Sequence, residues 1–482
     1  MVRPNLLFIM PDQLRADFLS CYGADFINTP HIDSLADEGV LYAQAYSPSP
    51  VCVPARCLLL TGRDAITNGV LGIDHFLRPD LAATGVRTWP QILGDAGYMT
   101  AAIGKMHFYP WDAALGFEHR VICEDKRWLE IQDDYYHHLA GKGLRKLHGS
   151  EHEGYQENRG AIICPYELDD SWDGFVGSQA ERFIRQYDDE RPFAAMVGFP
   201  GPHCPYDPCA EYAALFDPAD MPPAAPYVAS QDQAMVEANV RSNRGTWNGV
   251  DYAEFSDAHK AKVRAHYAAL VQQIDDQVGR ILQALKETGR LDNTIIIFSS
   301  DHGDMLGDHG LIGKTNFYEG SCHVPMLVRQ PGDGGRRVDA SLVSLADVTA
   351  TLLAMAGVDR PVWYDSQPLP GLGVETRARQ RVFGFLGNAL MNFDGRYKWV
   401  KYTNGRQLLF DLDTDPQEVT DLSCTDEGRH IARRLDGELT KQLLHSIQGA
   451  HSERLVAHET LWDSAVFGQP HWQRVYPQPM QE

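Results

Sequence analysis

The run Leu6-Leu7-Phe8-Ile9-Met10-Pro11-Asp12 begins as a short apolar segment and ends at a carboxylate. Three further apolar runs lead to chemically reactive side chains in the same way: Met99–Ile103 to Lys105 and His107, Phe193–Phe199 to His203, and Thr294–Phe298 to Asp301 and His302. Short apolar runs of this kind are typical of strands buried in a parallel sheet. Ligands bind beyond the carboxyl ends of such strands, so these polar residues are candidates for one shared site.

Helical patterns separate the predicted strands. Thr88–Gly97 is one, and Ala258–Thr288 is a longer one with apolar residues such as Val263, Tyr267 and Leu270 at helical spacing. Strands that alternate with helices indicate an α/β fold. We therefore expect a large, mostly parallel sheet sandwiched by helices, with residues 108–175 and 200–257 as insertions around the site.

The pattern changes after about residue 375. Short strand-like runs follow at Val382–Leu386, Lys398–Tyr402 and Gln407–Leu412, and Asn404-Gly405 between the last two is a strong hairpin signal. We predict a catalytic α/β domain over 1–375 and a smaller C-terminal domain over 376–450. The smaller domain is expected to combine an antiparallel sheet with a helix near 426–447.

A tail with aromatic residues but little periodicity follows at 451–482, with side chains at Trp462, Phe467, Trp472 and Tyr476. Such a tail is expected to pack on a neighbouring surface. We therefore predict an oligomer contact here, in a homo-oligomer.

Composition narrows the class of protein. The 482 residues carry 43 Lys and Arg against 65 Asp and Glu, a formal charge of −22. This acidity argues against nucleic acid or an anionic membrane as the main partner, although a local pocket can still bind an anion.

The nine cysteines are odd in number, scattered, and form no Cys-x-x-Cys pair, which argues against a disulfide framework and structural zinc. Leu6–Met10 is too short to span a membrane and is followed by no signal-cleavage site, so a cytoplasmic enzyme is expected.

The segment Cys52-Val53-Pro54-Ala55-Arg56-Cys57-Leu58-Leu59-Leu60-Thr61-Gly62-Arg63 places a thiol at a predicted helix start, four residues before an arginine. A helix N-terminus and a nearby cation both lower a thiol pKa. On these grounds alone, Cys52 is either a reactive thiol or a buried structural cysteine.

This segment resembles the Cys-x-Pro-x-Arg…Leu-Thr-Gly-Arg signature of the type I sulfatases of the alkaline phosphatase superfamily, with Ala55 where Ser is common. Further blocks resemble the family in the same order: Pro11-Asp12-Gln13, Thr29-Pro30-His31, Gly104-Lys105-Met106-His107, Pro202-His203, Ser300-Asp301-His302-Gly303-Asp304, Lys314 and Leu409-Phe410-Asp411. The resemblance covers nearly the whole chain.

The resemblance implies a modified nucleophile and a metal. Cys52 would be converted to formylglycine by a formylglycine-generating enzyme, and its hydrated aldehyde would attack the substrate. Asp12, Asp301, His302 and an oxygen of modified Cys52 would hold one divalent cation. Calcium is expected from the oxygen ligands, while the imidazole leaves manganese or magnesium open. Gln13 stands where many relatives have a second Asp, so its role as a ligand is left open.

The remaining roles follow from the same resemblance. Arg56 would orient the nucleophile, Lys105 and Lys314 would hold sulfate oxygens, and His203 would protonate the leaving oxygen. His107 would take a proton as the sulfate is released. His203 could instead be a structural loop histidine and Lys314 a surface lysine. We assign structural roles to His309 and to the pair His137-His138.

The sequence therefore predicts a sulfatase that hydrolyses a small sulfate ester. A phosphonate monoester or phosphodiester hydrolase is the alternative, because that branch resembles this chain at His302 but generally lacks the Lys105-x-His107 pair. An inactive relative that binds sulfated ligands and a redox protein using Cys52 and Cys57 are less favoured. The substrate is open among choline, aryl, alkyl and sugar sulfates, and aromatic residues near 108–136 are candidates for a quaternary ammonium cage.

Overall fold

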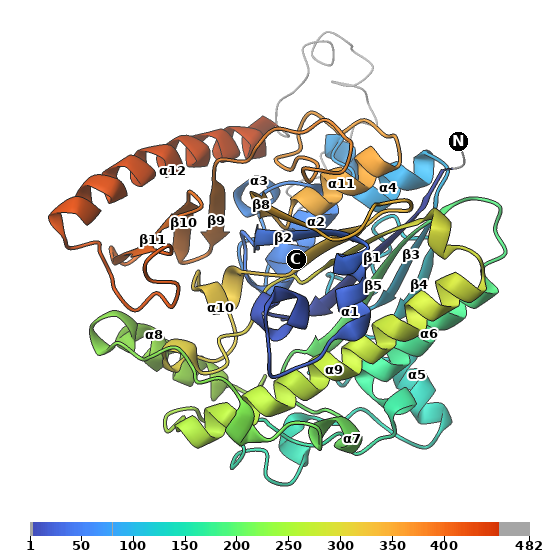
Figure 1. The fold of residues 1–482 in the computed structure, drawn as a ribbon, viewed down its shortest axis with the longest axis horizontal. Coiled ribbons are helices and arrows are strands. Elements are labelled where there is room, and N and C mark those ends of the chain that lie inside the picture. Colours follow the sequence, from blue (N-terminus) through green and yellow to red (C-terminus); the bar gives the residue numbers. More distant parts are fainter. Residues whose placement is uncertain (1–2, 80, 453–482) are drawn as a thin grey trace, which may run out of the picture.

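The computed structural model describes residues 3–79 and 81–452 (Figure 1). The tail side chains Trp462, Phe467, Trp472 and Tyr476 lie outside the described residues, as does the subunit contact predicted for them. No helix among the described residues is long and apolar enough to cross a membrane.

An eight-stranded sheet in the order β4-β3-β5-β1-β6-β7-β2-β8 forms the centre of the molecule. Its strands are β1 (Asn5–Asp12), β2 (Gly39–Tyr46), β3 (Met99–Gly104), β4 (His119–Ile122), β5 (Phe193–Pro202), β6 (Thr294–Ser299), β7 (Met326–Arg329) and β8 (Arg337–Ser344). Strand β7 runs antiparallel to β6 and β2, and the other neighbouring pairs are parallel. The predicted α/β fold is therefore confirmed, and the four predicted strands are the adjacent strands β3, β5, β1 and β6.

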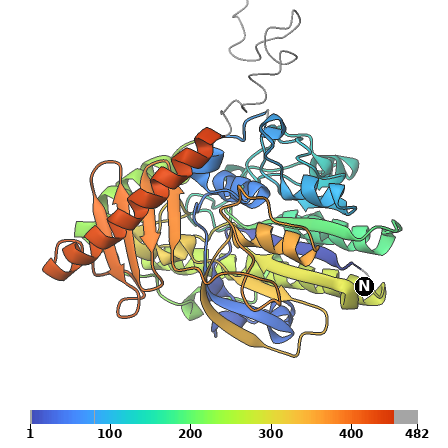
Figure 2. The same cartoon turned by 90° about the horizontal axis from the view of Figure 1, so that it is seen from above.

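Helices cover both faces of this sheet (Figures 1 and 2). One face packs on α1 (Pro30–Asp37), α6 (Trp172–Gln186) and α9 (Asp257–Glu287), and the other on α2 (Cys52–Thr61), α4 (Trp89–Asp95) and α11 (Asp347–Met355). Along β1, Leu7 and Ile9 belong to the first apolar cluster, whereas Leu6 and Phe8 belong to the second. This alternation explains why a fully buried strand reads as a continuous apolar run.

The insertions contribute more regular structure than the sequence indicates. Residues 119–122, expected to be irregular, form the edge strand β4, and α5 (Asp134–Gly141) follows. Only Ile122 of β4 is buried, so this strand has no apolar run by which to recognise it. The second insertion contains α7 (Ala210–Ala213) and α8 (Ala229–Asn243), while α3 (Ala65–Asn68) and α10 (Glu319–Cys322) lie elsewhere.

A separate antiparallel sheet in the order β12-β11-β10-β9 confirms the predicted C-terminal architecture. Its strands are β9 (Val382–Leu386), β10 (Ala389–Phe393), β11 (Tyr397–Tyr402) and β12 (Gln407–Asp411), and Gly405 in the predicted hairpin has φ +88°. Helix α12 (Asp426–Ser452) crosses one face of this sheet (Figure 2). The domain boundaries at 375 and 450 remain predictions.

The other face of the small sheet packs on the main α/β part through an apolar cluster that includes Met391, Phe410 and Phe317. A buried ion pair joins the two parts within this interface. The Lys398 Nζ of β11 lies 2.6 Å from Glu319 and 2.7 Å from Glu418, and the lysine side chain is 0% exposed. The small sheet is thus fixed by both apolar and charged contacts.

Candidate active site

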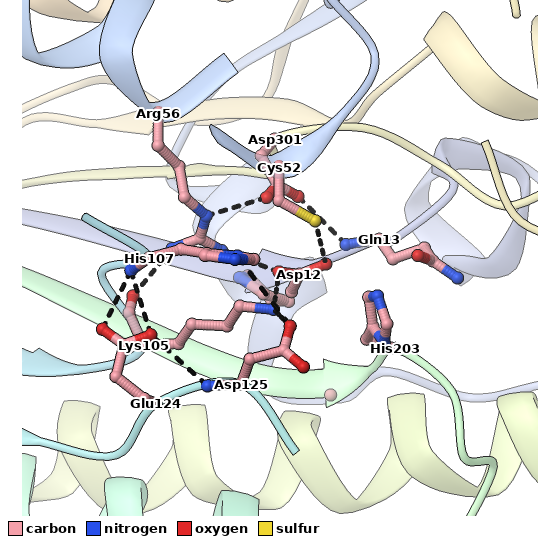
Figure 3. Close-up of polar contacts among 12 residues, drawn as sticks. Asp12, Gln13, Cys52, Arg56, Lys105, His107, Glu124, Asp125, His203 and Asp301 are labelled. Atoms are coloured by element: carbon pink, nitrogen blue, oxygen red, sulfur yellow. Dashed lines mark hydrogen bonds and ion pairs between the residues drawn. The ribbon is translucent and has the colours of Figure 1, made fainter. Parts of the chain in front are cut away.

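The predicted site residues meet at the carboxyl end of the central strands (Figure 3). Asp12 ends β1, Lys105 follows β3, His203 follows β5, and Asp301 follows β6. Cys52 is the first residue of α2, which contains Pro54 in its first turn and ends before Gly62 in the left-handed region at φ +66°. Proline is tolerated in the first turn and glycine is favoured after the last, so local sequence fixes where this helix begins and ends.

Four side chains form a buried cluster with the donor chemistry of a metal site. The ligand atoms of Asp12, Cys52, Asp301 and His302 all lie within 4.8 Å of one another, and each residue is 0% exposed. The His302 Nε2 is 3.2 Å from the Cys52 sulfur, 3.8 Å from Asp301 Oδ2 and 3.9 Å from Asp12 Oδ1. Two carboxylates and an imidazole around one point fit a divalent cation.

Two buried cations, Arg56 and Lys105, pair with the carboxylates of Asp12 and Asp301. Arg56 donates from Nε to Asp301 at 2.9 Å, from Nη2 to Asp12 at 3.1 Å, and from Nη1 to the Lys105 carbonyl at 2.7 Å. The Lys105 Nζ lies 2.7 Å from Asp12. Burial and Cys52 both act to raise the pKa of Asp12, but Lys105, His203 and Arg56 outweigh them, and the pKa lies below its usual value.

The thiol of Cys52 is also strongly perturbed. Burial acts to raise its pKa, but the charges of Lys314, Lys105 and His302 and a hydrogen bond with His107 bring it well below the usual value. The second cysteine of the segment differs, because Cys57 lies in the apolar cluster behind α2, where burial raises its thiol pKa to about 12. This contrast gives no support to a redox pair.

The Gln13 side chain is turned away from the candidate metal ligands Asp12, Cys52 and Asp301 (Figure 3). Its amide oxygen accepts a hydrogen bond from Lys314 and its amide nitrogen donates to Asp304, while its backbone N–H donates to Asp301 at 3.1 Å. Its φ of +72° is uncommon for a residue with a side chain. The Gln13 amide therefore lies with Lys314 and Asp304 in this structure.

His203 and Lys314 form a pair at the edge of the site. The Lys314 Nζ is 2.6 Å from His203 Nε2, and His203 Nδ1 is 2.6 Å from the Cys204 carbonyl. Burial, followed by the charges of Lys314 and Arg127, lowers the pKa of His203 to about 3. The imidazole is therefore neutral, with Nδ1–H donating to the carbonyl and Nε2 accepting from the lysine.

His107 is held by its backbone as well as its ring. Its φ is +56°, and its N–H donates to Glu124 at 2.9 Å. The ring meets Trp128 edge to face at 4.7 Å, and its Nδ1 is 3.8 Å from Asp125. A left-handed residue at this position costs backbone energy, which is typical of functional sites.

The sequence interpretation missed several residues that surround the site. Asp125 accepts from Lys105 at 2.6 Å and binds both Nε and Nη2 of Arg127, and Asp304 accepts from Tyr206 at 2.7 Å. Asp125 follows β4, which the sequence did not reveal as a strand, so no apolar run pointed to Asp125 as a residue at the end of a strand.

Other candidate residues lie outside this cluster. His309 stacks on Tyr318 at 4.0 Å, and His138 bonds Asp170 at 2.6 Å. Among the aromatic residues considered for an ammonium cage, Tyr135 is buried against Trp172. Tyr109 and Trp128 pack on each other at 5.4 Å and around His107.

Comparison with known proteins agrees with the geometry. A family model described as Sulfatase matches residues 4–358. An arylsulfatase of Clostridium perfringens is 29% identical over 93% of this chain and 95% of its own length. A choline-sulfatase of Rhizobium meliloti is 29% identical over 100% of this chain and 94% of its own. Among solved structures, a phosphonate monoester hydrolase of Agrobacterium radiobacter is 25% identical with a TM-score of 0.78, over 92% of this chain and 96% of its own.

Proposed function

This chain belongs to the sulfatase family and is a sulfuric ester hydrolase, and from that premise we propose that it cleaves a small organic sulfate monoester with residue 52 as the nucleophile. One observation carries the proposal. The Cys52 side chain begins a helix and lies against Asp12 and His302, with the buried cations Lys105 and Arg56 alongside. A nucleophile placed among fixed cations suits a transition state that spreads negative charge over oxygens.

Asp12, Asp301 and His302 would hold one divalent metal together with an oxygen of modified residue 52. The proposed ion is calcium, with manganese or magnesium as alternatives. When bound, it would polarise the sulfate and lower the pKa of a nearby hydroxyl.

In the proposed first step, a hydroxyl of hydrated formylglycine at position 52, already ionised with its proton released to water, attacks sulfur as the bond to the leaving alcohol breaks. Arg56 fixes the carboxylates around the nucleophile, and Lys105 stabilises sulfate oxygens. The leaving oxygen takes its proton from the Lys314–His203 pair, in which the lysine ammonium holds the proton at rest. Proton donation of this kind suits a paired lysine and imidazole.

In the second step, the other hydroxyl of residue 52 loses its proton, the aldehyde re-forms, and the carbon–oxygen bond to sulfate breaks. His107 is the proposed base, because its side chain hydrogen-bonds the Cys52 side chain and helps to lower the pKa of the thiol. Water then adds to the aldehyde and restores the diol. The reaction is thereby divided into two displacements, as in other covalent mechanisms.

The test compares wild type with Cys52→Ala and Cys52→Ser, both expected to lose sulfatase turnover. Peptide mass spectrometry of active wild-type enzyme should find an aldehyde at position 52. Full activity from protein that carries only the unmodified thiol would refute the nucleophile, while activity in Cys52→Ala would refute the site itself.

A phosphonate monoester or phosphodiester hydrolase is the second candidate, favoured by the 0.78 TM-score of the hydrolase from Agrobacterium radiobacter. The pair Lys105 and His107, both present here, supports the sulfatase instead, because the phosphonate monoester hydrolase branch generally lacks this pair. Rates on paired aryl sulfate and aryl phosphonate esters distinguish the two. A larger kcat/KM for the phosphonate would reverse the assignment.

A formylglycine-generating enzyme is the maturation partner that this proposal needs. The homo-oligomer and the cytoplasmic location remain predictions. Gel filtration with light scattering would measure the first.

A further inference from the structure

A cavity of about 330 Å³ opens beside the site, within the usual size range of ligand pockets. Its lining includes Gln13 and Lys314, which contact Asp301 and His203 of the site. Its walls come from α8, from the segment 311–316, from Asn388 in the turn between β9 and β10, and from Tyr402 of β11. Helix α8 lies near the small sheet in Figure 1, and the Tyr402 hydroxyl contacts the Met235 sulfur at 3.5 Å. The cavity is thus shaped by elements outside the catalytic sheet.

The cavity continues from the leaving-group side of the proposed reaction. Lys314, which lines it, is 2.6 Å from His203, the other member of the proposed proton-donating pair. A group attached to the oxygen that these two residues protonate would extend into the cavity. This step rests on the proposed function.

Amides and hydroxyls dominate the polar lining: Asn239, Ser242, Asn243, Asn248, Thr315, Asn316 and Asn388. Asn239, Asn243 and Asn248 are engaged in bonds within the protein. By contrast, no hydrogen bond between described residues uses the hydroxyls of Ser242 and Thr315 or the side-chain amide of Asn388. Asn316 accepts from the Tyr318 N–H at 3.0 Å, which leaves its amide nitrogen free. Four groups are therefore available to a ligand.

The charge around the cavity is positive. Lys314 is the one charged residue of its described lining, and no carboxylate lines it. The Arg127 guanidinium lies 5.1 Å from the ring centroid of Trp247, which also lines the cavity. Arg127 is already paired with Asp125, so a quaternary ammonium group would face the Lys314 ammonium and would find no carboxylate in the lining. This cavity therefore does not suit choline.

Aromatic surface completes the lining. Trp247 is 39% exposed, and its indole N–H is already bonded to the Ser242 carbonyl at 2.8 Å. Its ring therefore offers apolar surface rather than a donor. A flat ring beside unpaired amides and hydroxyls matches a ligand with one apolar face and several hydroxyl groups. Ser242, Thr315 and Asn388 are exposed and Asn316 is buried. A purely apolar aryl group would displace the water that these groups bind without replacing its hydrogen bonds, at a cost in affinity.

We propose that this cavity is the leaving-group site and that it selects a hydroxyl-rich alcohol of sugar-ring size, so that the substrate is a monosaccharide sulfate. Asn388, Asn316 and Ser242 bind its hydroxyls, and Trp247 packs on its carbon–hydrogen face.

The test measures kcat/KM for a nitrophenyl sulfate, choline sulfate, and two hexose sulfates esterified at a primary and at a secondary hydroxyl. At least one hexose sulfate should exceed choline sulfate by about tenfold or more, the worth of one or two recognised hydroxyls. Trp247→Ala and Asn388→Ala should each lower kcat/KM for that hexose sulfate by about tenfold more than for the nitrophenyl ester. Tyr227→Ala is the matched control, since Tyr227 is 46% exposed and is not part of the cavity lining.

The outcomes separate this inference from the proposed function. Hydrolysis of the nitrophenyl ester, with choline sulfate equal to or better than both hexose sulfates, would overturn the sugar site and leave the sulfatase intact. An equal loss on both esters in the two variants would also overturn it. Absence of hydrolysis of every sulfate by aldehyde-bearing enzyme would refute the proposed function as well.

Discussion

Replacement of Arg56 by Met tests how far the site depends on a buried guanidinium. Arg56 is 1% exposed and contacts two carboxylates and one carbonyl, at 2.9, 3.1 and 2.7 Å. Removing one partner of a buried ion pair costs about 3–5 kcal/mol, because the remaining charge stays buried without compensation. Two carboxylates lose a partner here, so we expect a loss near the upper end, about 5 kcal/mol of unfolding free energy at neutral pH.

Equilibrium urea unfolding in the presence of a chelator measures this loss without an offset from bound metal. Arg56→Lys should recover only part of it, because an ammonium cannot serve both carboxylates and the carbonyl with the geometry of the guanidinium. The gap to wild type should narrow as pH falls toward the ordinary carboxyl pKa of about 3.9, where a proton can replace the missing cation. Arg191→Met is the control, since Arg191 pairs with Asp189 and Glu118 at the surface and should change stability little.

A loss below about 1 kcal/mol in Arg56→Met would refute this reasoning, because that is the range of an exposed pair. Such a result, together with lost activity, would mean that the guanidinium acts on substrate and is not needed to hold the carboxylates.

Three other measurements address separate parts of the molecule. The pKa of His203 is about 3 in the folded protein and about 6.5 in the unfolded chain, so below pH 6.5 only the unfolded state binds a proton at this residue. The free energy of unfolding of the wild type should therefore fall by up to about 1.4 kcal/mol for each unit that the pH falls. Urea unfolding of His203→Gln at several pH values should show a weaker pH dependence. Removal of divalent metal should lower the melting temperature of wild type but change that of Asp301→Asn much less, as scanning calorimetry with and without chelator would show; equal shifts in both proteins would place the metal elsewhere. Lys398→Met should cost about 3 kcal/mol in denaturant unfolding, because it leaves the buried Glu418 beside the partly buried Glu319 without a cation; an unchanged midpoint would contradict the importance of this ion pair.

The sequence indicated the centre of the fold better than its edges. Strands β1, β3, β5 and β6 are buried on both faces and give continuous apolar runs, which a linear pattern reveals. Strand β8 begins with exposed residues and only Ile122 of β4 is buried, so neither has such a run. Strand membership there depends on pairing with distant segments, which no local pattern contains.

The site was predictable where a residue follows a recognised strand or belongs to a family motif. Asp12, Lys105, His203 and Asp301 meet that condition and come together in the structure. The direction of the Gln13 amide was not predictable, because it depends on contacts with Lys314 and Asp304, roughly three hundred positions along the chain. Spacing along a sequence carries no information about such contacts.

The complete burial of Cys52 has a consequence for the order of events in the cell. A second enzyme cannot bind the side chain of Cys52 in the folded protein, because this side chain is 0% exposed at the N-terminus of the buried helix α2. The proposed oxidation of this thiol must therefore happen while the polypeptide is still extended, during or just after its synthesis. Folding of the nascent chain and oxidation of Cys52 therefore compete, and the fraction of active protein depends on their relative rates.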